Sequence, residues 1–193
     1  RFYIEMIINN KQPKTTPAFS SENAFNNNRS IYLRLLAWIP ALFVAAAIFW
    51  FSSKPAVEST EMSDSVSRLI LLIGTKFGFF RGDPTQYADL IELMSFPVRK
   101  TAHMTEYLVF YGTVRFGLHF SYRTPDLRRR LFAAFVIVFC YACTDEFHQL
   151  FVPGRAGRFT DVMIDCFLVL VVTFICFARH CEQNRQEKSD SVR

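Results

Sequence analysis

Apolar runs separated by charged loops divide the sequence into segments that suit a membrane. Leu35–Phe51 carries no charged residue, and with its flanking residues it reaches the length of about 20 residues that a helix needs to cross a bilayer. Trp38 and Trp50 lie near its two ends, as interfacial aromatic residues do. We predict a first transmembrane span at residues 33–53. The competing interpretation is a cleaved signal peptide. The apolar run is longer than the apolar region of a signal peptide, and the polar segment before it is longer than usual.

Three later apolar runs are too short to cross the bilayer by themselves. As helices, Leu131–Thr144 and Cys166–Ala178 would each be roughly 20 Å long, against about 30 Å of hydrocarbon. The uncharged part of the remaining run, Tyr107–Val114, is shorter still. Each run can cross only by taking its polar end into the membrane. On this basis we predict spans at residues 101–120, 131–150 and 161–178.

The segment between the first two spans is predicted to contain a helix at the membrane surface. Val66–Phe80 is apolar, but Arg68 and Lys76 interrupt it, which favours an interfacial or loop helix over a span. Gly82-Asp83-Pro84 is expected to break whatever precedes it. Overall, 51% of the residues are hydrophobic while 20% are charged, a mixture typical of apolar spans joined by charged loops. The predicted fold is an all-α polytopic membrane helix bundle with about four transmembrane helices and one interfacial helix.

The distribution of basic residues predicts the orientation of these spans. The loop Tyr122–Arg130 carries four arginines and one aspartate, so it is expected in the cytoplasm. Residues 1–30 read as a polar, disordered cytoplasmic tail and residues 181–193 as a charged cytoplasmic tail, with a membrane domain at 31–180. With four spans, both termini lie inside and the loops 52–100 and 152–160 outside. The three polar helix ends are therefore predicted to gather at the outer leaflet.

The remaining composition excludes some classes of protein. The formal net charge of +5 is modest and shows no nucleic-acid-binding signature, so no nucleic-acid partner is expected. The five cysteines are an odd number, and four of them fall inside apolar runs, which argues against a disulfide framework. Cys140 and Cys143 are spaced like a redox or zinc pair, but no second pair accompanies them, so we interpret them as packing residues.

The polar helix ends carry the candidate functional residues. An unpaired charge within a span costs roughly 2.5–3.5 kcal/mol, so carboxylates there must be paired, protonated or close to the interface. Helical spacing arranges these residues as stripes that could enclose one pocket beneath the Pro153-Gly154-Arg155 turn. The candidate catalytic residues are His103, Glu106, Asp145 and Glu146, of which His103 or Glu106 would move protons. The candidates for binding a substrate or an anion are Lys100, Gln149, Arg155, Asp161 and Asp165.

Other interpretations of the same residues stay open. Asp161 also suits the first turn of a helix, where the macrodipole favours a carboxylate, and Arg115 suits a snorkelling side chain. The whole cluster could be an ion-pair network that staples the helices. Two ligands one turn apart, in His103-x-x-Glu106 and Asp145-x-x-His148, would suit a divalent metal and a membrane hydrolase. We assign no metal ligands and predict no cofactor, because acids and bases are too mixed for a dedicated metal cage.

The polar motifs together resemble those of the VanZ-like family. The resemblance rests on Arg99-Lys100-x-x-His103-x-x-Glu106-Tyr107, on Thr144-Asp145-Glu146-x-His148-Gln149-x-Phe151-x-Pro153-Gly154-Arg155, on Asp161-x-x-x-Asp165 and on Phe51-Ser52-Ser53-Lys54-Pro55. It covers roughly residues 33–178. The chain departs from the family at Leu168 and Val172, where the family usually has small residues. Members are small multi-pass bacterial membrane proteins, named after an accessory protein of glycopeptide-resistance clusters that raises resistance to teicoplanin.

The resemblance implies a location and a process rather than a reaction. The expected location is the bacterial cytoplasmic membrane, and the expected partners are the lipid bilayer and a cell-wall lipid precursor or a glycopeptide. The preferred function is binding or processing of a cell-envelope lipid or precursor at the outer leaflet, linked to teicoplanin resistance. The alternatives are a non-catalytic membrane scaffold and a metal-dependent membrane hydrolase. Whether the protein is an enzyme is left open.

Overall fold

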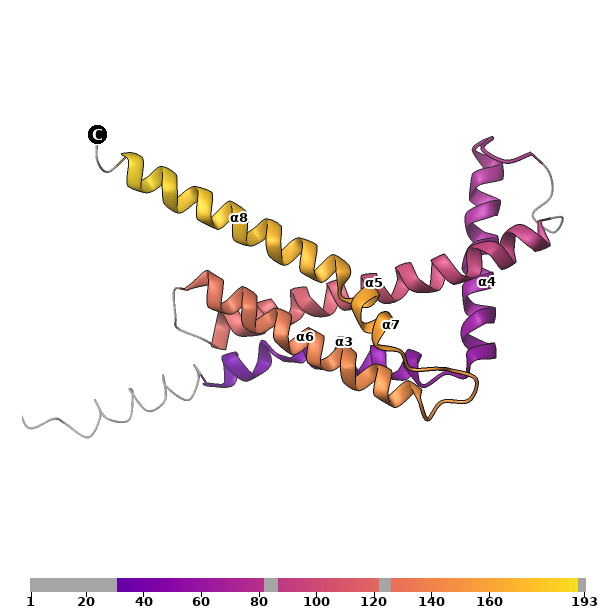
Figure 1. Cartoon of the computed structure of the whole chain (residues 1–193), viewed down its shortest axis with the longest axis horizontal. Coiled ribbons are helices and arrows are strands. Elements are labelled where there is room, and N and C mark those ends of the chain that lie inside the picture. The colour runs from indigo at the N-terminus through magenta and orange to yellow at the C-terminus, as the bar shows by residue number, and fades with distance from the viewer. Residues whose placement is uncertain (1–30, 82–86, 122–125, 191–193) are drawn as a thin grey trace, which may run out of the picture. The chain divides into compact units, whose positions relative to one another are not determined.

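The computed structural model describes residues 31–81, 87–121 and 126–190, and these are helices joined by short connections without a strand (Figure 1). The predicted all-α fold class is confirmed. The predicted tail 1–30 and the Gly82-Asp83-Pro84 break lie outside the described residues. Chain contacts separate Arg1–Leu36 from Ala37–Arg193, and the six helices α3 to α8 belong to the second unit. Its helices are α3 (Ile39–Ser52), α4 (Ala56–Lys76), α5 (Ala88–Ser121), α6 (Leu127–Gln149), α7 (Phe159–Asp165) and α8 (Phe167–Asp190).

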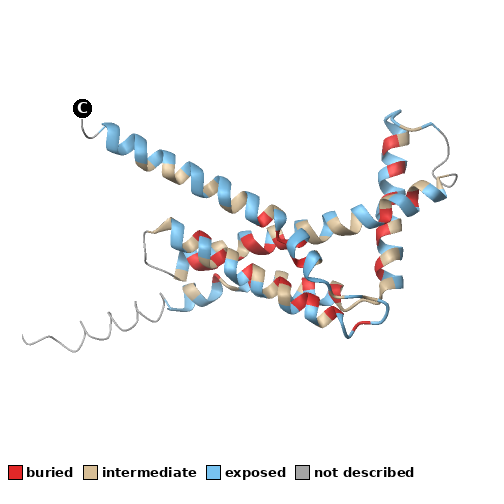
Figure 2. Ribbon diagram, in the orientation of Figure 1, coloured by how far each residue is buried: buried red, intermediate tan, exposed pale blue. Residues whose placement is uncertain are grey.

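The hydrophobic core lies where α3, α5 and α6 pack together, with α7 and the start of α8 against them. Tyr107 and Tyr111 of α5 are its largest fully buried side chains. Small residues of α6, Ala134 and Ala142, allow close packing beside them. The opposite faces of the same helices remain apolar and exposed, as Figure 2 shows in pale blue, with Phe174 70% exposed. Continuous exposed apolar surface of this kind is what a lipid environment requires.

The helices that satisfy the length and hydropathy of a membrane span agree in part with the predicted spans. Ile31–Ser52 and Leu127–Gln149 are long and apolar enough to cross, and they match the predictions 33–53 and 131–150. The pair Phe159–Asp165 and Phe167–Asp190 passes only as one broken span, bent by 43°. The described residues therefore hold two such helices, or three with the broken pair. The predicted count of four stays a prediction.

The predicted span 101–120 is the second half of a much longer helix. At 34 residues, α5 would be about 51 Å long, more than the thickness of the hydrocarbon layer. Its first half packs against α4, and its second half packs against α3, α6 and α8. The boundary between the halves carries Lys100, His103 and Glu106, so the polar residues sit midway along the helix rather than at an end.

The helix α4 begins and ends earlier than the predicted segment Val66–Phe80. It begins after Pro55, and Ser59, Ser63 and Ser67 form a buried stripe of small residues along one of its faces. It ends at Lys76, because Gly78 adopts a left-handed φ of 79° and the Phe79 backbone N–H donates to the Gly74 carbonyl. The apolar residues expected to define this helix form only its second half.

The chain does not run straight from residue 161 to 178, as the third short span was expected to do. The helix is interrupted at Cys166, between α7 and α8, without a proline or glycine at the break. Beyond the break, α8 continues to Asp190 and includes residues expected to form a charged tail. The Glu, Gln, Arg and Lys residues there are good helix formers, which explains the continuation.

Candidate functional site

A buried carboxylate hub joins the ends of α3 and α6 to the middle of α5. Asp145 Oδ2 accepts hydrogen bonds from Ser52 Oγ at 2.7 Å, Tyr107 OH at 3.0 Å and Gln149 Nε2 at 3.4 Å. Gln149 Nε2 also donates to Ser52 Oγ at 2.8 Å. Asp145 is only 3% exposed. Three donors stabilise this carboxylate and fix the relative positions of three helices.

The loop after α6 is held against the same helix end by a second carboxylate. Glu146 Oε2 accepts the backbone N–H of Arg158 at 2.9 Å, just before α7 begins. Gly157 lies so close to α6 that an added Cβ would overlap the Glu146 carbonyl oxygen. The loop can therefore approach only because residue 157 is a glycine. This contact positions α7 beside α6.

The Pro153-Gly154-Arg155 turn is fixed to the C-terminal end of α3. Gly154 has a φ of 74°, a left-handed conformation that favours glycine. Arg155 Nε donates to the Lys54 carbonyl at 2.9 Å, and an Nη donates to the Phe51 carbonyl at 3.4 Å. The Ala56 N–H donates to the Pro153 carbonyl at 3.2 Å. Arg155 thus caps carbonyls at the end of α3 while its guanidinium remains beside the polar residues of α5.

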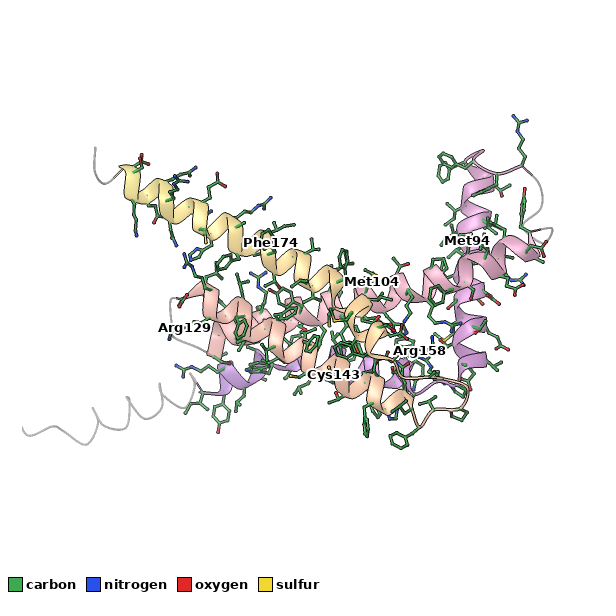
Figure 3. The ribbon with its side chains drawn as sticks, in the orientation of Figure 1. Met94, Met104, Arg129, Cys143, Arg158 and Phe174 are labelled. Carbon is green, nitrogen blue, oxygen red and sulfur yellow. The ribbon has the colours of Figure 1, made fainter. Side chains whose placement is uncertain are left out.

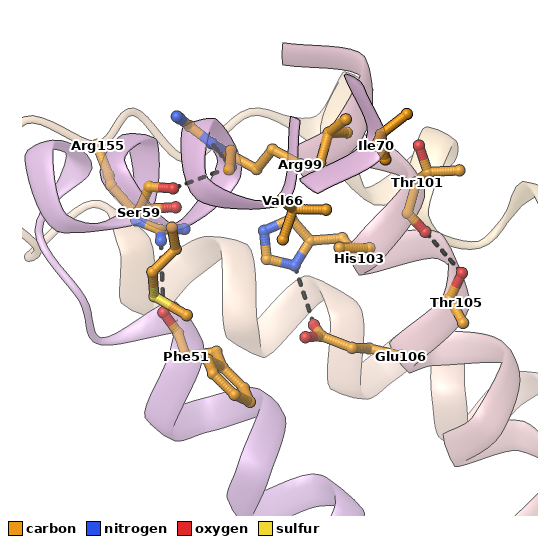
Figure 4. Close-up of a pocket in the computed structure, with 14 residues that line it drawn as sticks. Phe51, Ser59, Val66, Ile70, Arg99, Thr101, His103, Thr105, Glu106 and Arg155 are labelled. Atoms are coloured by element: carbon orange, nitrogen blue, oxygen red, sulfur yellow. Dashed lines mark hydrogen bonds and ion pairs between the residues drawn. The ribbon is translucent and has the colours of Figure 1, made fainter. Parts of the chain in front are cut away.

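Two charged pairs come from the middle of α5. Lys100 Nζ lies 2.9 Å from Asp161 Oδ1 in the first turn of α7. His103 Nδ1 lies 3.2 Å from Glu106 Oε2, one helical turn further on. In Figure 4 the His103 ring lies between Glu106 on one side and the arginines Arg99 and Arg155 on the other. An imidazole in contact with a carboxylate is a suitable group for moving a proton.

These elements enclose a small polar cavity of about 150 Å³. We call it the polar cavity. It is bounded by α5, the end of α6, the start of α7 and the 154–156 turn. Residues that are far apart in the sequence therefore lie close together around it. Six of the nine candidate residues line it: Lys100, His103, Glu146, Gln149, Arg155 and Asp161.

The other three candidates lie close to the polar cavity without lining it. Glu106 borders an adjoining groove together with His103. Asp145 lies behind Gln149 in the buried hub. Asp165 is 2% exposed, and it is near enough to His103 and Lys100 to interact with them electrostatically. Asp145 and Asp165 are thus positioned to orient or balance the charge of residues that do face the cavity.

The positive charge of the site is concentrated on two arginines. Arg99 donates to the hydroxyl oxygens of Thr60 at 2.5 Å and Ser63 at 3.5 Å. Among the described residues, no carboxylate lies within ion-pair distance of Arg99 or Arg155. Burial and the neighbouring Arg99 lower the pKa of Arg155. Asp145, Glu146 and Glu106 act on the pKa of Arg155 in the opposite direction, but none of them forms an ion pair with either guanidinium among the described residues, so both groups keep N–H donors for an anion.

The two residue pairs considered for a metal, His103 with Glu106 and Asp145 with His148, do not join into one group of ligands among the described residues. Asp145 Oδ2 is engaged by Ser52, whereas His148 Nε2 lies 3.1 Å from Ser53 Oγ and its ring stacks on Phe49. Among the residues that the structure describes, no three His, Cys, Asp or Glu side chains are grouped as metal ligands would be. The five cysteines, all within those residues, are free. Arg115 contacts the Tyr111 ring and Cys176.

Ser52 and Arg99 are site residues that the candidate set did not include. Ser52 is fully buried and bridges Asp145 and Gln149, and Arg99 lines the polar cavity beside Lys100. Both belong to the motifs that carry the family resemblance. Apart from those motifs, nothing in the sequence indicates that a serine at the end of an apolar span is a site residue. Its role becomes visible only when α3 and α6 are seen side by side.

A family comparison covers all of these residues. The profile described as VanZ/LLP1 matches residues 37–180, which include every element of the polar cavity. The chain belongs to the VanZ/LLP1 family. Searches of curated proteins and of solved structures gave no match. Apolar helices and VanZ/LLP1 membership together identify a membrane-type helical protein, and the expected resemblance is confirmed. Figure 3 shows the side chains of this VanZ/LLP1 domain, with Met104 on α5, Cys143 on α6 and the exposed Arg158 just before α7.

Proposed function

We propose that this VanZ-like membrane protein binds, or binds and processes, the anionic headgroup of a cell-envelope lipid or lipid precursor. The observation that carries the proposal is the polar cavity, where Lys100, Arg155 and Arg99 gather beside the His103–Glu106 pair. The cations supply hydrogen-bond donors for an anion, and the imidazole–carboxylate pair is suited to proton transfer. In this proposal Lys100 and Arg155 hold the anion while His103 or Glu106 acts as acid or base.

The proposal includes a location and a consequence for the cell. By the arginine-rich loop before α6, the polar cavity faces the outer leaflet of the bacterial cytoplasmic membrane, with both termini in the cytoplasm. A protein that binds cell-wall lipid precursors there would change the availability of the target of glycopeptides. The expected consequence is reduced susceptibility to teicoplanin.

The decisive experiment compares growth under teicoplanin of a susceptible bacterial strain that expresses wild type or Glu146→Gln. Glu146 lines the polar cavity and accepts the Arg158 backbone N–H. The substitution Glu146→Gln replaces its carboxylate with a neutral amide, so it should abolish the phenotype at unchanged membrane abundance. Glu92→Gln is the matched control, because Glu92 is exposed on α5 and lines neither cavity. Resistance that persists in Glu146→Gln at normal abundance would contradict the proposal.

A scaffold without catalysis is the second candidate, and a specific observation favours it. The hub around Asp145 joins α3, α5 and α6, and Asp145 itself is buried and does not line the polar cavity, as expected of a structural staple. If stapling is the main role of the whole cluster, Glu146→Gln and Arg155→Ala should lower protein abundance and phenotype in parallel. A loss of phenotype at constant abundance therefore separates the site from the scaffold.

A further inference from the structure

An apolar groove of about 620 Å³ runs between α4 and the middle of α5. Met62, Val66 and Ile70 of α4 form one wall at four-residue intervals, so they lie on one helix face. They are 43%, 46% and 42% exposed, respectively, although all are apolar. Ala102 and Thr105 contribute to the opposite wall, and their small side chains leave the space open.

Three of the hydroxyl groups along this groove, those of Ser63, Thr101 and Thr105, donate to carbonyls of their own helices. Thr101 Oγ1 donates to the Pro97 carbonyl, and Thr105 Oγ1 donates to the Thr101 carbonyl at 2.7 Å. Ser63 Oγ donates to the Ser59 carbonyl at 2.9 Å. These residues therefore present few free donors to an occupant. A peptide would leave its amide groups without partners there, whereas a hydrocarbon chain has none to satisfy.

The groove and the polar cavity meet at three charged or titratable side chains. Arg99, His103 and Arg155 line both. In Figure 4 Val66 lies beside the His103 ring, and Ile70 lies farther from Arg155. Arg99 is held in place by Thr60 and Ser63, which are neutral and leave its charge uncompensated. Glu106 also lines the groove, where it contacts His103. An occupant that suits both the two arginines and the apolar wall combines an anion with a hydrocarbon chain.

We infer that the ligand is a lipid phosphate whose hydrocarbon chain lies in the groove between α4 and α5 and whose phosphate is bound by Arg99 and Arg155. This inference rests on the proposed function and assigns the groove as its chain subsite. Arg155 reaches the phosphate with the donors that the Phe51 and Lys54 carbonyls leave free, and His103 lies at the side of the polar cavity. Free phosphate would fill the junction but leave the apolar groove empty.

The test uses the full chain in phosphatidylcholine nanodiscs and a phosphatidic acid probe with a photoreactive diazirine on one acyl chain. Adducts are located by peptide mass spectrometry, and labelling of α4 and α5 at the groove is divided by labelling around the exposed Phe174 of α8. A diacylglycerol with the same diazirine chain reports binding without phosphate. Unlabelled phosphatidic acid and inorganic phosphate serve as competitors. The variants are Arg99→Gln with Arg68→Gln as control, and Val66→Trp with Val57→Trp as control.

We expect saturable groove labelling by phosphatidic acid that is about ten-fold stronger than by the diacylglycerol, since an anion gains charge-assisted hydrogen bonds. Arg99→Gln should remove most of that difference, and Val66→Trp should reduce labelling by filling the groove. The controls should leave both unchanged, because Arg68 and Val57 are exposed on α4 and line neither cavity. Ile70→Trp replaces Val66→Trp if the latter lowers thermal stability.

Three outcomes would overturn the inference. Equal labelling by the diacylglycerol would show that the phosphate does not contribute to binding. Labelling unaffected by Val66→Trp and Ile70→Trp would show that the acyl chain does not lie in the groove. Competition by inorganic phosphate at the same concentration as phosphatidic acid would identify a free anion as the ligand. In each case the teicoplanin phenotype of Glu146→Gln still decides the proposed function separately.

Discussion

Lys100 on α5 and Asp161 on α7 form an ion pair of 2.9 Å across the polar cavity, although 61 positions separate them in the sequence. Their side chains are only 16% and 23% exposed, so solvent screens this pair less than a surface pair. The pair therefore orients α7 relative to α5. It also leaves Asp161, in the first turn of α7, with two favourable influences, the lysine and the helix dipole.

We predict that exchanging the two charges rescues what either single change loses. Lys100→Asp alone places two carboxylates together, and Asp161→Lys alone places two ammonium groups together. The double variant restores the attraction, with a coupling free energy of about 0.5–3 kcal/mol. Thermal unfolding of the four purified proteins in one detergent measures the coupling. Strictly additive effects would show that the pair contributes nothing.

We predict that Ser52→Ala lowers stability by about 1–3 kcal/mol, because it removes a donor from the buried Asp145 carboxylate. Gln149 would also lose the hydroxyl to which its amide donates. The matched control is Ser65→Ala, since Ser65 is exposed and bonds only the carbonyl one turn earlier in α4. The melting temperature in detergent is the measurement. Equal melting temperatures for both variants would refute the role assigned to Ser52.

We predict that Gly157→Ala disrupts the site while Gly112→Ala does not. A Cβ at residue 157 would overlap the Glu146 carbonyl, so the loop and α7 would have to move. A Cβ at residue 112 meets nothing within 4 Å. The expected result is loss of the teicoplanin phenotype and of phosphatidic acid labelling for Gly157→Ala alone. Wild-type behaviour of Gly157→Ala would mean that the close approach is dispensable.

We predict that the 154–156 turn is reachable from outside the cell. In a background without the native cysteines, Ala156→Cys should react with a membrane-impermeant thiol reagent in intact cells. Gln186→Cys near the end of α8 should react only after the membrane is opened. Both residues are exposed, so accessibility reports the side of the membrane rather than burial. The reverse pattern would contradict the orientation inferred from the basic loop.

The meeting of polar helix ends could be predicted from the lengths of the apolar runs together with the distribution of basic residues in the loops. Leu131–Thr144 is too short to cross the bilayer, so Asp145, Glu146 and Gln149 must enter it, and in the structure they lie against α3, α5 and the loop before α7. His103 also reaches this site, although it lies midway along the long helix α5 and not at the end of a short one, as the lengths had predicted. Hydrophobic length thus predicted which residues approach one another.

The partners of individual side chains could not be predicted in the same way. The contact between Asp145 and Ser52 depends on the packing of α3 beside α6, and a serine at the end of a span has many possible roles. The groove depends on where α4 begins, and its first half is polar and gives no hydrophobic signal. The interruption at Cys166 has no proline or glycine to mark it. These features arise from tertiary contacts between distant segments.

The bonds of Arg155 have a consequence for how the protein is made. This side chain caps carbonyls of Phe51 and Lys54, which precede it by 104 and 101 positions. During synthesis, the Phe51 and Lys54 carbonyls therefore lack these donors until α4, α5 and α6 have been synthesised. A chain that ends before residue 155 could insert its first segments in the bilayer, yet it would lack the Arg155 hydrogen bonds that hold the 154–156 turn against the end of α3. Assembly of the pocket is thus one of the last events of biogenesis.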